Sequence, residues 1–599
     1  MPAPRHLRSA CITLLFATLV HAAERTPAND PADQVLQHGI IATIDAGDHV
    51  VQAIAIRGGR IVYVGSDVGA KVFIGTDTRV TDLHGRMVMP GLIDGHMHPL
   101  DGGGALMTCN LDYAPLTLPQ FSARIQACLD ASKDQEPAGW LQVTGWYRQF
   151  MRPPGTDASA ATLDALKTER PIVVASTDGH TIVTNHRGLA LAGINSASPD
   201  VADGRIGRDA LGNPTGVLED GGQRPLTAVL PKPDSATERK MARAALAAMR
   251  EQGITTFLDA AASPGSIAAF SALYKEGGLT ARAHFAPVID VKDAADPVAV
   301  VAALKITKAL YDSGPTAMAP AITVRNAKIF MDGVLQAPAQ TAVLMAPYRE
   351  NFGTAAAPHW VSGTKTGEVY FPAEVLNPLL VALGEAGIEP HIHAIGDRAV
   401  HQALDAIEVM RNAVPDPELR VAIAHDELVD PADYGRFEAL NATPVMSFQW
   451  AKPGPDSIDA TRDYLGPERF ARMEPEGLLY EAHARIAYGS DWPVDRLNEW
   501  FALKVGITRT GDPALGARYA GRLNAQKGLP REAALRAVTM NAAYELHQDA
   551  DTGSLEVGKL ADLIVLDRNV LKIPADQIAG TRVLLTLVGG NPVYRAKDF

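Results

Sequence analysis

Residue types that bind metal ions end five short apolar runs of this 599-residue chain. The five runs end at His96 and His98, Lys328, His393, His425 and Asp491. Each run is rich in β-branched and other apolar residues, a composition typical of a buried strand. The C-terminal ends of parallel barrel strands meet at one face of the barrel, where active sites form. The sequence therefore predicts that these side chains lie together, although they are far apart along the chain.

The donor atoms of this set are nitrogen and oxygen, which suit a divalent transition metal. His96 and His98, two positions apart on one strand, point to the same face and can reach one ion. The four histidines and the Asp491 carboxylate favour Zn²⁺, with Mn²⁺, Fe²⁺ and Co²⁺ as alternative occupants. Ordinary core histidines are a weak alternative for His96 and His98, because few structural roles explain Asp-Gly-His-x-His-Pro at a strand end. That alternative is stronger for His393 and His425 when each is taken alone.

The order of these motifs resembles that of the amidohydrolase superfamily, and specifically its YtcJ-like branch, amidohydrolase 3. The resemblance extends from about residue 33 to the end of the chain. Supporting stretches are Ala-Ile-Gly-Asp-Arg-Ala after His393, Gly-Ser-Asp-Trp-Pro-Val around Asp491, and the tail Gly-Ser-Leu-Glu-Val-Gly-Lys-Leu-Ala-Asp-Leu-Ile-Val-Leu-Asp, which ends at Asp567. The resemblance implies a metal-dependent hydrolase on a distorted (β/α)8 barrel with a flanking β-sandwich.

The pattern of strands and helices predicts an α/β chain of the same organisation. Short strands alternate with turns in residues 35–89 and again in 552–599, so we expect both ends to form one β-sandwich. Between them, residues 90–551 alternate strand and helix as a (β/α)8 TIM barrel requires. Residues from about 105 to 235 interrupt that rhythm after barrel strand one, and we expect this insertion to cover the barrel mouth. Barrel strands are predicted to end at His98 and to span 253–259, 282–289, 322–331, 391–395, 420–424, 444–448 and 485–488.

The first 22 residues have the pattern of a secretory signal peptide. Arg5 and Arg8 form a basic start, residues 10–20 form an apolar run, and Val-His-Ala before residue 23 is an acceptable cleavage site. A membrane anchor is the alternative, but the apolar run is shorter than the roughly 20 residues that a span needs. We expect a mature chain that begins near Ala23, continues through a flexible lead-in over 23–34, and lies in the periplasm or outside the cell. No other stretch has the pattern of a membrane span.

The composition of the full chain restricts its possible partners. A net charge of −13 argues against nucleic acid or an anionic membrane surface as a partner. A small-molecule substrate is expected, and a homodimer is left open as an assembly state. Cys109 and Cys128 are the only cysteines after residue 22, and an even pair in an exported protein is a disulfide candidate. Two separate buried thiols are the alternative, since no cysteine or histidine cluster marks either residue as a metal ligand.

Lys328 is the unusual member of the set, because an ammonium beside two cations is unfavourable. A lysine that has reacted with CO₂ is a carbamate, an anion whose two oxygens can bridge two metals. The resemblance implies this modification for the lysine that ends barrel strand four. A surface lysine is the alternative, yet Lys328 has apolar neighbours and ends a strand. The sequence from Asp332, Asp-Gly-Val-Leu-Gln-Ala, differs from the Asp-Gly-Ser-Leu-Gly-Ser that is common in the family, a departure that concerns the substrate loop more than the ligand.

The resemblance implies two metal ions bridged by carbamylated Lys328, with a hydroxide held between them. Asp491 is then both a ligand and the proton carrier, a general base followed by a general acid. His180 is expected to contact the substrate or to stabilise the oxyanion, with a turn histidine as the alternative. Asp220 and Gln449 are weaker candidates for substrate binding.

His391 lies two positions before His393 and shares its face of the strand, so it is a candidate supporting or substitute ligand, ranked behind His393. Together these features predict an exported metal-dependent hydrolase that cleaves an amide-type C–N bond with a metal-bound hydroxide. A metal-dependent isomerase or lyase on the same scaffold is one alternative. A non-catalytic barrel binding protein is another, and it is disfavoured because metal ligands are costly to keep buried without a metal.

Overall fold

The computed structural model describes residues 30–599 apart from 135–138, 154, 178, 200–203 and 355. The predicted signal peptide at 1–22 and residues 23–29 of the predicted lead-in lie outside the described residues. From Ala32 onward the chain is part of the fold, because the Ala32 amide donates to the carbonyl of Phe73 at 2.7 Å. None of the helices within the described ranges combines the length and apolar character needed to cross a bilayer.

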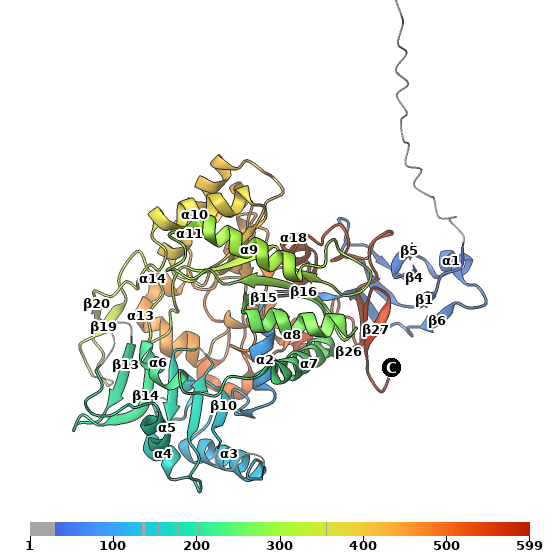
Figure 1. The fold of residues 1–599 in the computed structure, drawn as a ribbon. Coiled ribbons are helices and arrows are strands. Elements are labelled where there is room, and N and C mark those ends of the chain that lie inside the picture. The colour runs from blue at the N-terminus through green and yellow to red at the C-terminus, as the bar shows by residue number, and fades with distance from the viewer. Residues whose placement is uncertain (1–29, 135–138, 154, 178, 200–203, 355) are drawn as a thin grey trace, which may run out of the picture.

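Parallel strands form two arcs in the middle of the molecule (Figure 1). The first arc contains β8 (Leu92–Met97), β15 (Ile254–Ala262), β16 (Arg282–Pro287) and β17 (Ile322–Thr323). The second contains β18 (Asn326–Phe330), β21 (Glu389–Ala394), β22 (Val421–His425), β23 (Ala442–Met446) and β24 (Ala487–Tyr488). A parallel bridge between Val288 and Lys328 links the arcs on one side. On the other side, the Asp491 amide donates to the carbonyl of His96 at 2.7 Å.

The predicted strand over 322–331 is divided in the structure. Its first part, β17, pairs with β16, and its second part, β18, pairs with β21 in the other arc. The division falls at Val324 and Arg325, which belong to neither strand. This correction matters for the site, because Lys328 then lies on the strand that pairs in register with β21, opposite His391.

Helices alternate with these strands and cover their outer faces (Figure 1). They are α7 (Ser235–Gln252), α8 (Pro264–Lys275), α9 (Pro297–Tyr311), α10 (Ala373–Glu385), α11 (Asp397–Ala413), α12 (Tyr434–Ala439), α15 (Glu476–Glu481) and α16 (Glu499–Thr508). Local signals set their limits. The Asp234 side chain caps α7 by accepting from the Thr237 amide, and Gly253, at φ 91°, ends the helix and leads into β15. The largest buried cluster lies between the strands and these helices.

Two further sheets are built from the ends of the chain, the first from N-terminal strands alone and the second from strands of both ends. The first sheet contains β5 (Arg60–Gly65), β4 (Ala53–Arg57), β1 (Gln34–Gln37) and β6 (Arg79–Asp82). The second contains β27 (Asn591–Arg595), β26 (Val583–Val588), β25 (Leu563–Leu566), β7 (Met87–Pro90), β2 (Ile40–Ala42) and β3 (Val50–Val51). The two sheets share one buried aliphatic cluster. A buried ion pair, Arg282 Nε to Asp562 Oδ2 at 2.7 Å, fixes the second sheet to β16.

A third unit lies between β8 and α7, where the insertion is predicted. Its six-stranded sheet contains β13 (Gly204–Arg208), β14 (Pro214–Asp220), β12 (Thr181–Thr184), β11 (Ile172–Ser176), β10 (Leu141–Trp146) and β9 (Cys109–Asn110). The helices α3 (Leu118–Ala131), α4 (Ala160–Asp164) and α5 (His186–Leu191) pack beside it (Figure 1). The unit has hydrophobic clusters of its own, one of which contains Phe121 and Trp146. The overall architecture is an α/β fold with mixed sheets.

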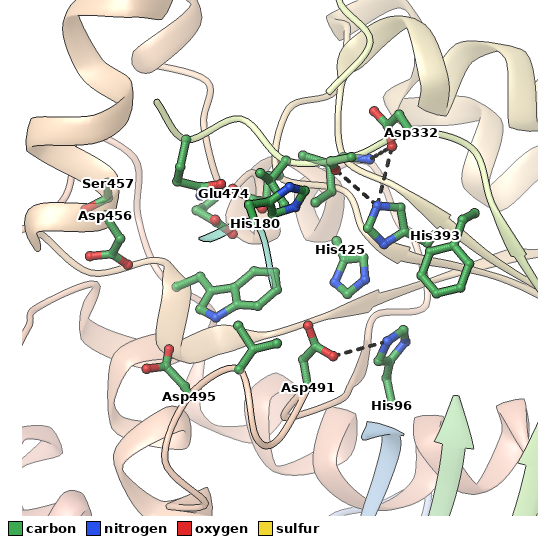
Figure 2. A pocket seen from close by; sticks show the side chains of 18 of the residues that line it. His96, His180, Asp332, His393, His425, Asp456, Ser457, Glu474, Asp491 and Asp495 are labelled. Atoms are coloured by element: carbon green, nitrogen blue, oxygen red, sulfur yellow. Dashed lines mark hydrogen bonds and ion pairs between the residues drawn. The ribbon is translucent and has the colours of Figure 1, made fainter. Parts of the chain in front are cut away.

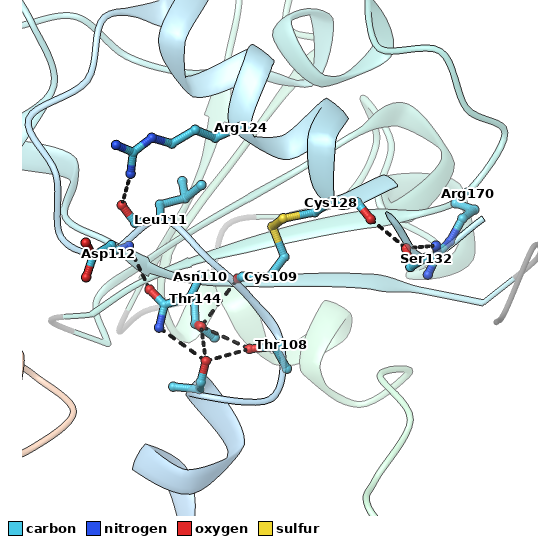
Figure 3. Close-up of a disulfide and its surroundings, with 11 residues drawn as sticks. Thr108, Cys109, Asn110, Leu111, Asp112, Arg124, Cys128, Ser132, Thr144 and Arg170 are labelled. Atoms are coloured by element: carbon cyan, nitrogen blue, oxygen red, sulfur yellow. Dashed lines mark hydrogen bonds between the residues drawn. A yellow bond between two sulfur atoms is a disulfide. The ribbon is translucent and has the colours of Figure 1, made fainter. Parts of the chain in front are cut away.

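A disulfide joins Cys109 on β9 to Cys128 on α3 (Figure 3). The two Cα atoms lie 5.7 Å apart. This confirms the predicted pairing over the alternative of two separate thiols. The bond fixes the edge strand of the inserted sheet to the helix beside it.

We predict that the double variant Cys109→Ser/Cys128→Ser has a free energy of unfolding lower by about 3 kcal/mol, because the disulfide restricts the unfolded chain. Urea unfolding of the wild type and the double variant measures the difference. Reductant should destabilise the wild type and leave the double variant unchanged. Two free thiols per denatured, unreduced chain lacking residues 1–22 would contradict the disulfide itself.

Candidate metal centre and active site

Three predicted ligands converge where the first and last strands of the arcs meet. Nε2 of His98 lies 2.9 Å, and Nε2 of His96 3.5 Å, from Oδ1 of Asp491. One ligand atom from each residue can be chosen so that all three lie within 4.8 Å of one another. Two imidazoles and one carboxylate at this spacing are a donor set that fits Zn²⁺ or a similar divalent ion.

Lys328 lies beside this group and is fully buried. Its Nζ is 3.3 Å from Nε2 of His96 and 4.6 Å from the ring centre of Phe330. Burial lowers the pKa of Lys328 to about 7, although the carboxylates of Asp491 and Asp259 act in the opposite direction. A substantial part of this amine is therefore uncharged at neutral pH, the form in which an amine is nucleophilic.

His425 and His393 continue the cluster across β22 and β21 (Figure 2). The ring centre of His425 lies 4.6 Å from that of His96 and 4.5 Å from that of His393. Within the described residues, the buried Nδ1 of His425 has no hydrogen-bond partner. Burial lowers the pKa of His393 to about 3 and that of His425 well below its usual value, so both rings are neutral and able to bind a metal.

A buried carboxylate holds the two sides of the three-ligand group together. Oδ1 of Asp94, on β8, accepts from the amide of His96 at 3.1 Å and from the amide of Ser490 at 3.0 Å. The Asp94 side chain therefore bridges the strand that carries His96 to the turn that carries Asp491. Asp491 itself has a φ of 54° and His425 a φ of 85°. Such left-handed conformations are uncommon for residues other than glycine and are found more often at functional sites.

Asp332 organises the loop beyond Lys328. Its carboxylate accepts from the amides of Val343, Ile395 and Gly396 at 2.8–3.0 Å, and its Oδ1 lies 3.6 Å from Nε2 of His393 (Figure 2). It thus ties the loop after β18 to the end of β21. The signal in the sequence was its position in an Asp-Gly pair four residues after Lys328, but its role as an acceptor of three amides was not predicted.

His391 lies behind His96. Its Nε2 is 2.7 Å from Nδ1 of His96, and its Nδ1 is 3.1 Å from Oε1 of Glu545, without the alignment of a hydrogen bond. All three side chains are buried. The contact occupies Nδ1 of His96 and so leaves Nε2 as the nitrogen that points to Asp491.

The inserted unit contributes His180, which lines the cavity onto which the predicted metal ligands open, called the main cavity below because of those ligands and not because of its size. Its Nδ1 lies 2.6 Å from Oδ1 of Asp220, which has a φ of 47° and orients the ring from behind. Asp220 itself is not among the described residues that line this cavity. Gln449 is buried, donates to the carbonyl of Ser490 at 2.5 Å and lines a neighbouring cavity. The structure therefore places His180 in the cavity that the predicted metal ligands line, and places Asp220 and Gln449 behind the cavity wall.

The main cavity has a volume of about 350 Å³. Apolar side chains form part of its wall, among them Phe330, Trp450 and Val494. Four carboxylates that the motifs did not indicate also line it, namely Glu427, Asp456, Glu474 and Asp495. Three of them come from loops and Asp456 from the π-helical segment η6 (Pro455–Arg462), so no strand pattern could have identified them.

Comparison with known proteins identifies the family. A sequence profile described as the amidohydrolase family matches residues 79–594. The chain belongs to the amidohydrolase family. This amidohydrolase is 25% identical over 572 residues to the Bacillus subtilis (strain 168) protein designated YtcJ, covering 94% of this chain and 99% of that protein. It is 22% identical over 573 residues to the N-substituted formamide deformylase of Arthrobacter pascens, a match that covers 93% of this chain and 97% of that protein.

A solved structure shows the same fold. It is described as an uncharacterized metal-dependent hydrolase from Pyrococcus horikoshii OT3 and has a TM-score of 0.69 at 20% identity, covering 91% of this chain and 99% of that one. The two arcs of parallel strands agree with a TIM barrel of this type. Family membership confirms the resemblance seen in the motifs and makes the protein a metal-dependent amidohydrolase.

We predict that Zn²⁺ added to chelator-treated protein stabilises it by about 2.7 kcal/mol at a free concentration 100 times Kd, because the ion binds only the folded ligand set. Urea unfolding with and without Zn²⁺ measures the effect. His98→Ala should lose most of it, whereas His84→Ala, which changes an exposed side chain (72% accessible), should keep it. An equal Zn²⁺ effect in both variants would assign the stabilisation to another site.

Proposed function

We propose that this amidohydrolase is an exported enzyme that hydrolyses an amide-type C–N bond with the help of two divalent metal ions, Zn²⁺ being the favoured occupant. The observation that carries the proposal is the convergence of His96, His98 and Asp491 beside the buried Lys328. His393 and His425 complete the ligand set. The relative named as a deformylase of N-substituted formamides supports the choice of a C–N bond.

The two metals require an anion in place of the lysine ammonium. The neutral amine of Lys328 can attack CO₂, forming an N–C bond and releasing one proton, which leaves a carbamate. Its low pKa and its position next to His96 support this modification. A bound divalent metal supplies Lewis acidity and lowers the pKa of a coordinated water toward about 7.

The side chains of the cavity provide the remaining chemistry. Asp491 accepts the proton of the attacking water and delivers it to the leaving nitrogen, so that it acts first as base and then as acid. His180, held by Asp220, faces the ligands across the cavity and stabilises the oxygen that becomes negatively charged.

We also propose a domain organisation and a cellular location for the chain. We interpret the parallel strands as a distorted (β/α)8 barrel, the two sheets from the chain ends as a flanking β-sandwich, and the unit over about 105–235 as a cover of the barrel mouth. Export is supported by the basic and apolar pattern of residues 1–22 and by the Cys109–Cys128 disulfide, a bond typical of oxidising compartments.

The test of the reaction class is a panel of N-substituted formamides and acetamides with Zn²⁺-loaded protein. Hydrolysis releases the amine and the acid, and reaction in ¹⁸O-labelled water places the label in the acid. A product with the mass of the substrate, or one lacking added water, would instead indicate an isomerase or a lyase.

For Lys328→Ala we expect loss of at least one metal per chain and of most of the activity, because the bridging anion is absent. A short carboxylic acid such as acetate at high concentration should restore part of both. Metal analysis and intact mass of the wild type, with and without one added CO₂, provide the measurement. One metal per chain in fully active protein with an unmodified Lys328 would falsify the two-metal arrangement.

For Asp491→Asn we expect a different outcome: metal content largely retained and kcat lowered by roughly 100-fold or more, because the amide cannot carry the proton. Metal analysis alongside kcat separates the two roles of Asp491. Asp463→Asn, which changes a half-exposed carboxylate on α13 (Asp463–Leu465), is the matched control and should behave as wild type. Retention of kcat in Asp491→Asn would leave Asp491 as a ligand only.

A further inference from the structure

The end of the main cavity away from the metal ligands is acidic. Glu427, Asp456, Glu474 and Asp495 all line it. Figure 2 shows Asp456, Glu474 and Asp495 on the side of the cavity remote from His96 and His393. The carboxylates belong to different segments of the chain, three loops and the π-helical segment η6, so their proximity is a product of tertiary structure and not of a local charge run.

Fewer cationic side chains than carboxylates lie at this end of the cavity. Lys452 is buried, and its Nζ lies 3.5 Å from Asp456 Oδ2 and 3.7 Å from Asp495 Oδ2. Across the described part of the chain, no salt bridge reaches Glu427 or Glu474, and the Glu427 carboxylate accepts only from the side-chain amide of Gln336 at 3.2 Å. One cation therefore serves the four carboxylates.

Arg509, whose charge acts on Glu474, does not change this balance. Arg509 is fully buried and forms an ion pair with Glu476 at 2.5 Å. Toward Glu474 it donates at 2.7 Å to the backbone carbonyl only. Its charge is thus already matched by a carboxylate that does not line the cavity.

Two carboxylate oxygens at this end have no partner within the described residues. They are Oε1 of Glu474, whose residue is 1% exposed, and Oδ1 of Asp456, whose residue is 8% exposed. A buried polar atom without a partner costs free energy, so native proteins rarely retain one unless a ligand or water completes it. Burial and the neighbouring carboxylate of Glu427 raise the pKa of Glu474 well above its usual value, and a bound cation would relieve that repulsion.

The spacing of these carboxylates favours an organic cation over a metal ion. Among the described residues, only His96, His98 and Asp491 bring three ligand atoms within 4.8 Å of one another. The acidic end therefore does not form a metal cage. An ammonium or guanidinium group carries three to five donors and can reach acceptors spread over a larger space.

We infer that the acidic end of the cavity binds a cationic group of the substrate, and that the substrate is an N-acyl amine carrying an ammonium or guanidinium at the end remote from the scissile bond. The inference rests on the proposed function, which sets the scissile bond at the metal ligands. Trp450, which stacks on His425 at 5.3 Å between ring centres, provides an apolar wall for the chain that joins the two ends of such a substrate.

The experiment compares two ligands that differ only in the distal group, N-(4-aminobutyl)acetamide and its neutral isostere N-pentylacetamide. Their Kd values are measured by calorimetry with metal-loaded Asp491→Asn protein, in which turnover does not interfere. We expect the cationic ligand to bind at least roughly tenfold more tightly, since charge-assisted hydrogen bonds replace contacts that an alkyl group cannot make. When Glu474→Gln is added to the Asp491→Asn protein, the preference for the cationic ligand should largely disappear. The control is Glu481→Gln in the same background, at the exposed end of α15, and it should retain the preference.

Equal Kd values for the two ligands, no measurable binding of the cationic one, or an unchanged preference after Glu474→Gln would each overturn the inference. The comparison of ligands on the unaltered acidic end does not depend on the folding of the Glu474→Gln variant. Turnover by wild-type protein is measured separately. If the cationic ligand is preferred but neither ligand is hydrolysed by the metal-loaded wild type, the cation site stands and the proposed reaction fails.

Discussion

The metal centre depends on two hydrogen bonds that the Asp94 carboxylate accepts between the first and the last of the parallel strands. Their donors are the amides of His96 and Ser490, two residues that are almost 400 positions apart in the chain. These two bonds add to the direct bond from the Asp491 amide to the His96 carbonyl, and together they fix the turn that carries Asp491 against the strand that carries His96. The Asp94 contact is not free of cost, since burial raises the pKa of Asp94 to about 7. Because it is buried, the Asp94 carboxylate holds its two amide partners at a fixed separation, as the geometry of a metal site requires.

The same burial explains why this cluster needs a metal. Lys328, His96 and His425 are each almost fully buried, and the positive charges they would carry repel one another. The structure therefore favours their uncharged forms, which are the forms that bind metal ions or react with CO₂. Binding a divalent ion replaces the hydration that these groups lost on folding. Metal affinity and folding stability are in this way two consequences of one arrangement.

The chemistry of the site could be predicted from the sequence to a greater extent than its shape. His96, His98 and Asp491 end apolar runs, and strand periodicity with parallel pairing is enough to predict that such ends converge. Glu427 and Glu474 had no such signal. Their approach depends on loop packing, including the bond from the Glu474 amide to the Glu427 carbonyl at 2.8 Å, which links two loop residues that are 47 positions apart in the sequence.

The two ends of the cavity are built by different kinds of structure, and this separation has a functional consequence. The metal ligands lie at strand ends whose register is fixed by neighbouring strands, such as Phe330 opposite His393. Asp456, at the acidic end, lies in the π-helical segment η6 (Pro455–Arg462). π-Helical turns are rare overall, and those that occur are frequently found at functional sites. Changes in such segments and in the loops beside them can alter which substrate is bound without moving a metal ligand, because the strands carry the metal ligands. On this scaffold, substrate choice can therefore diverge while the bond-breaking chemistry stays constant.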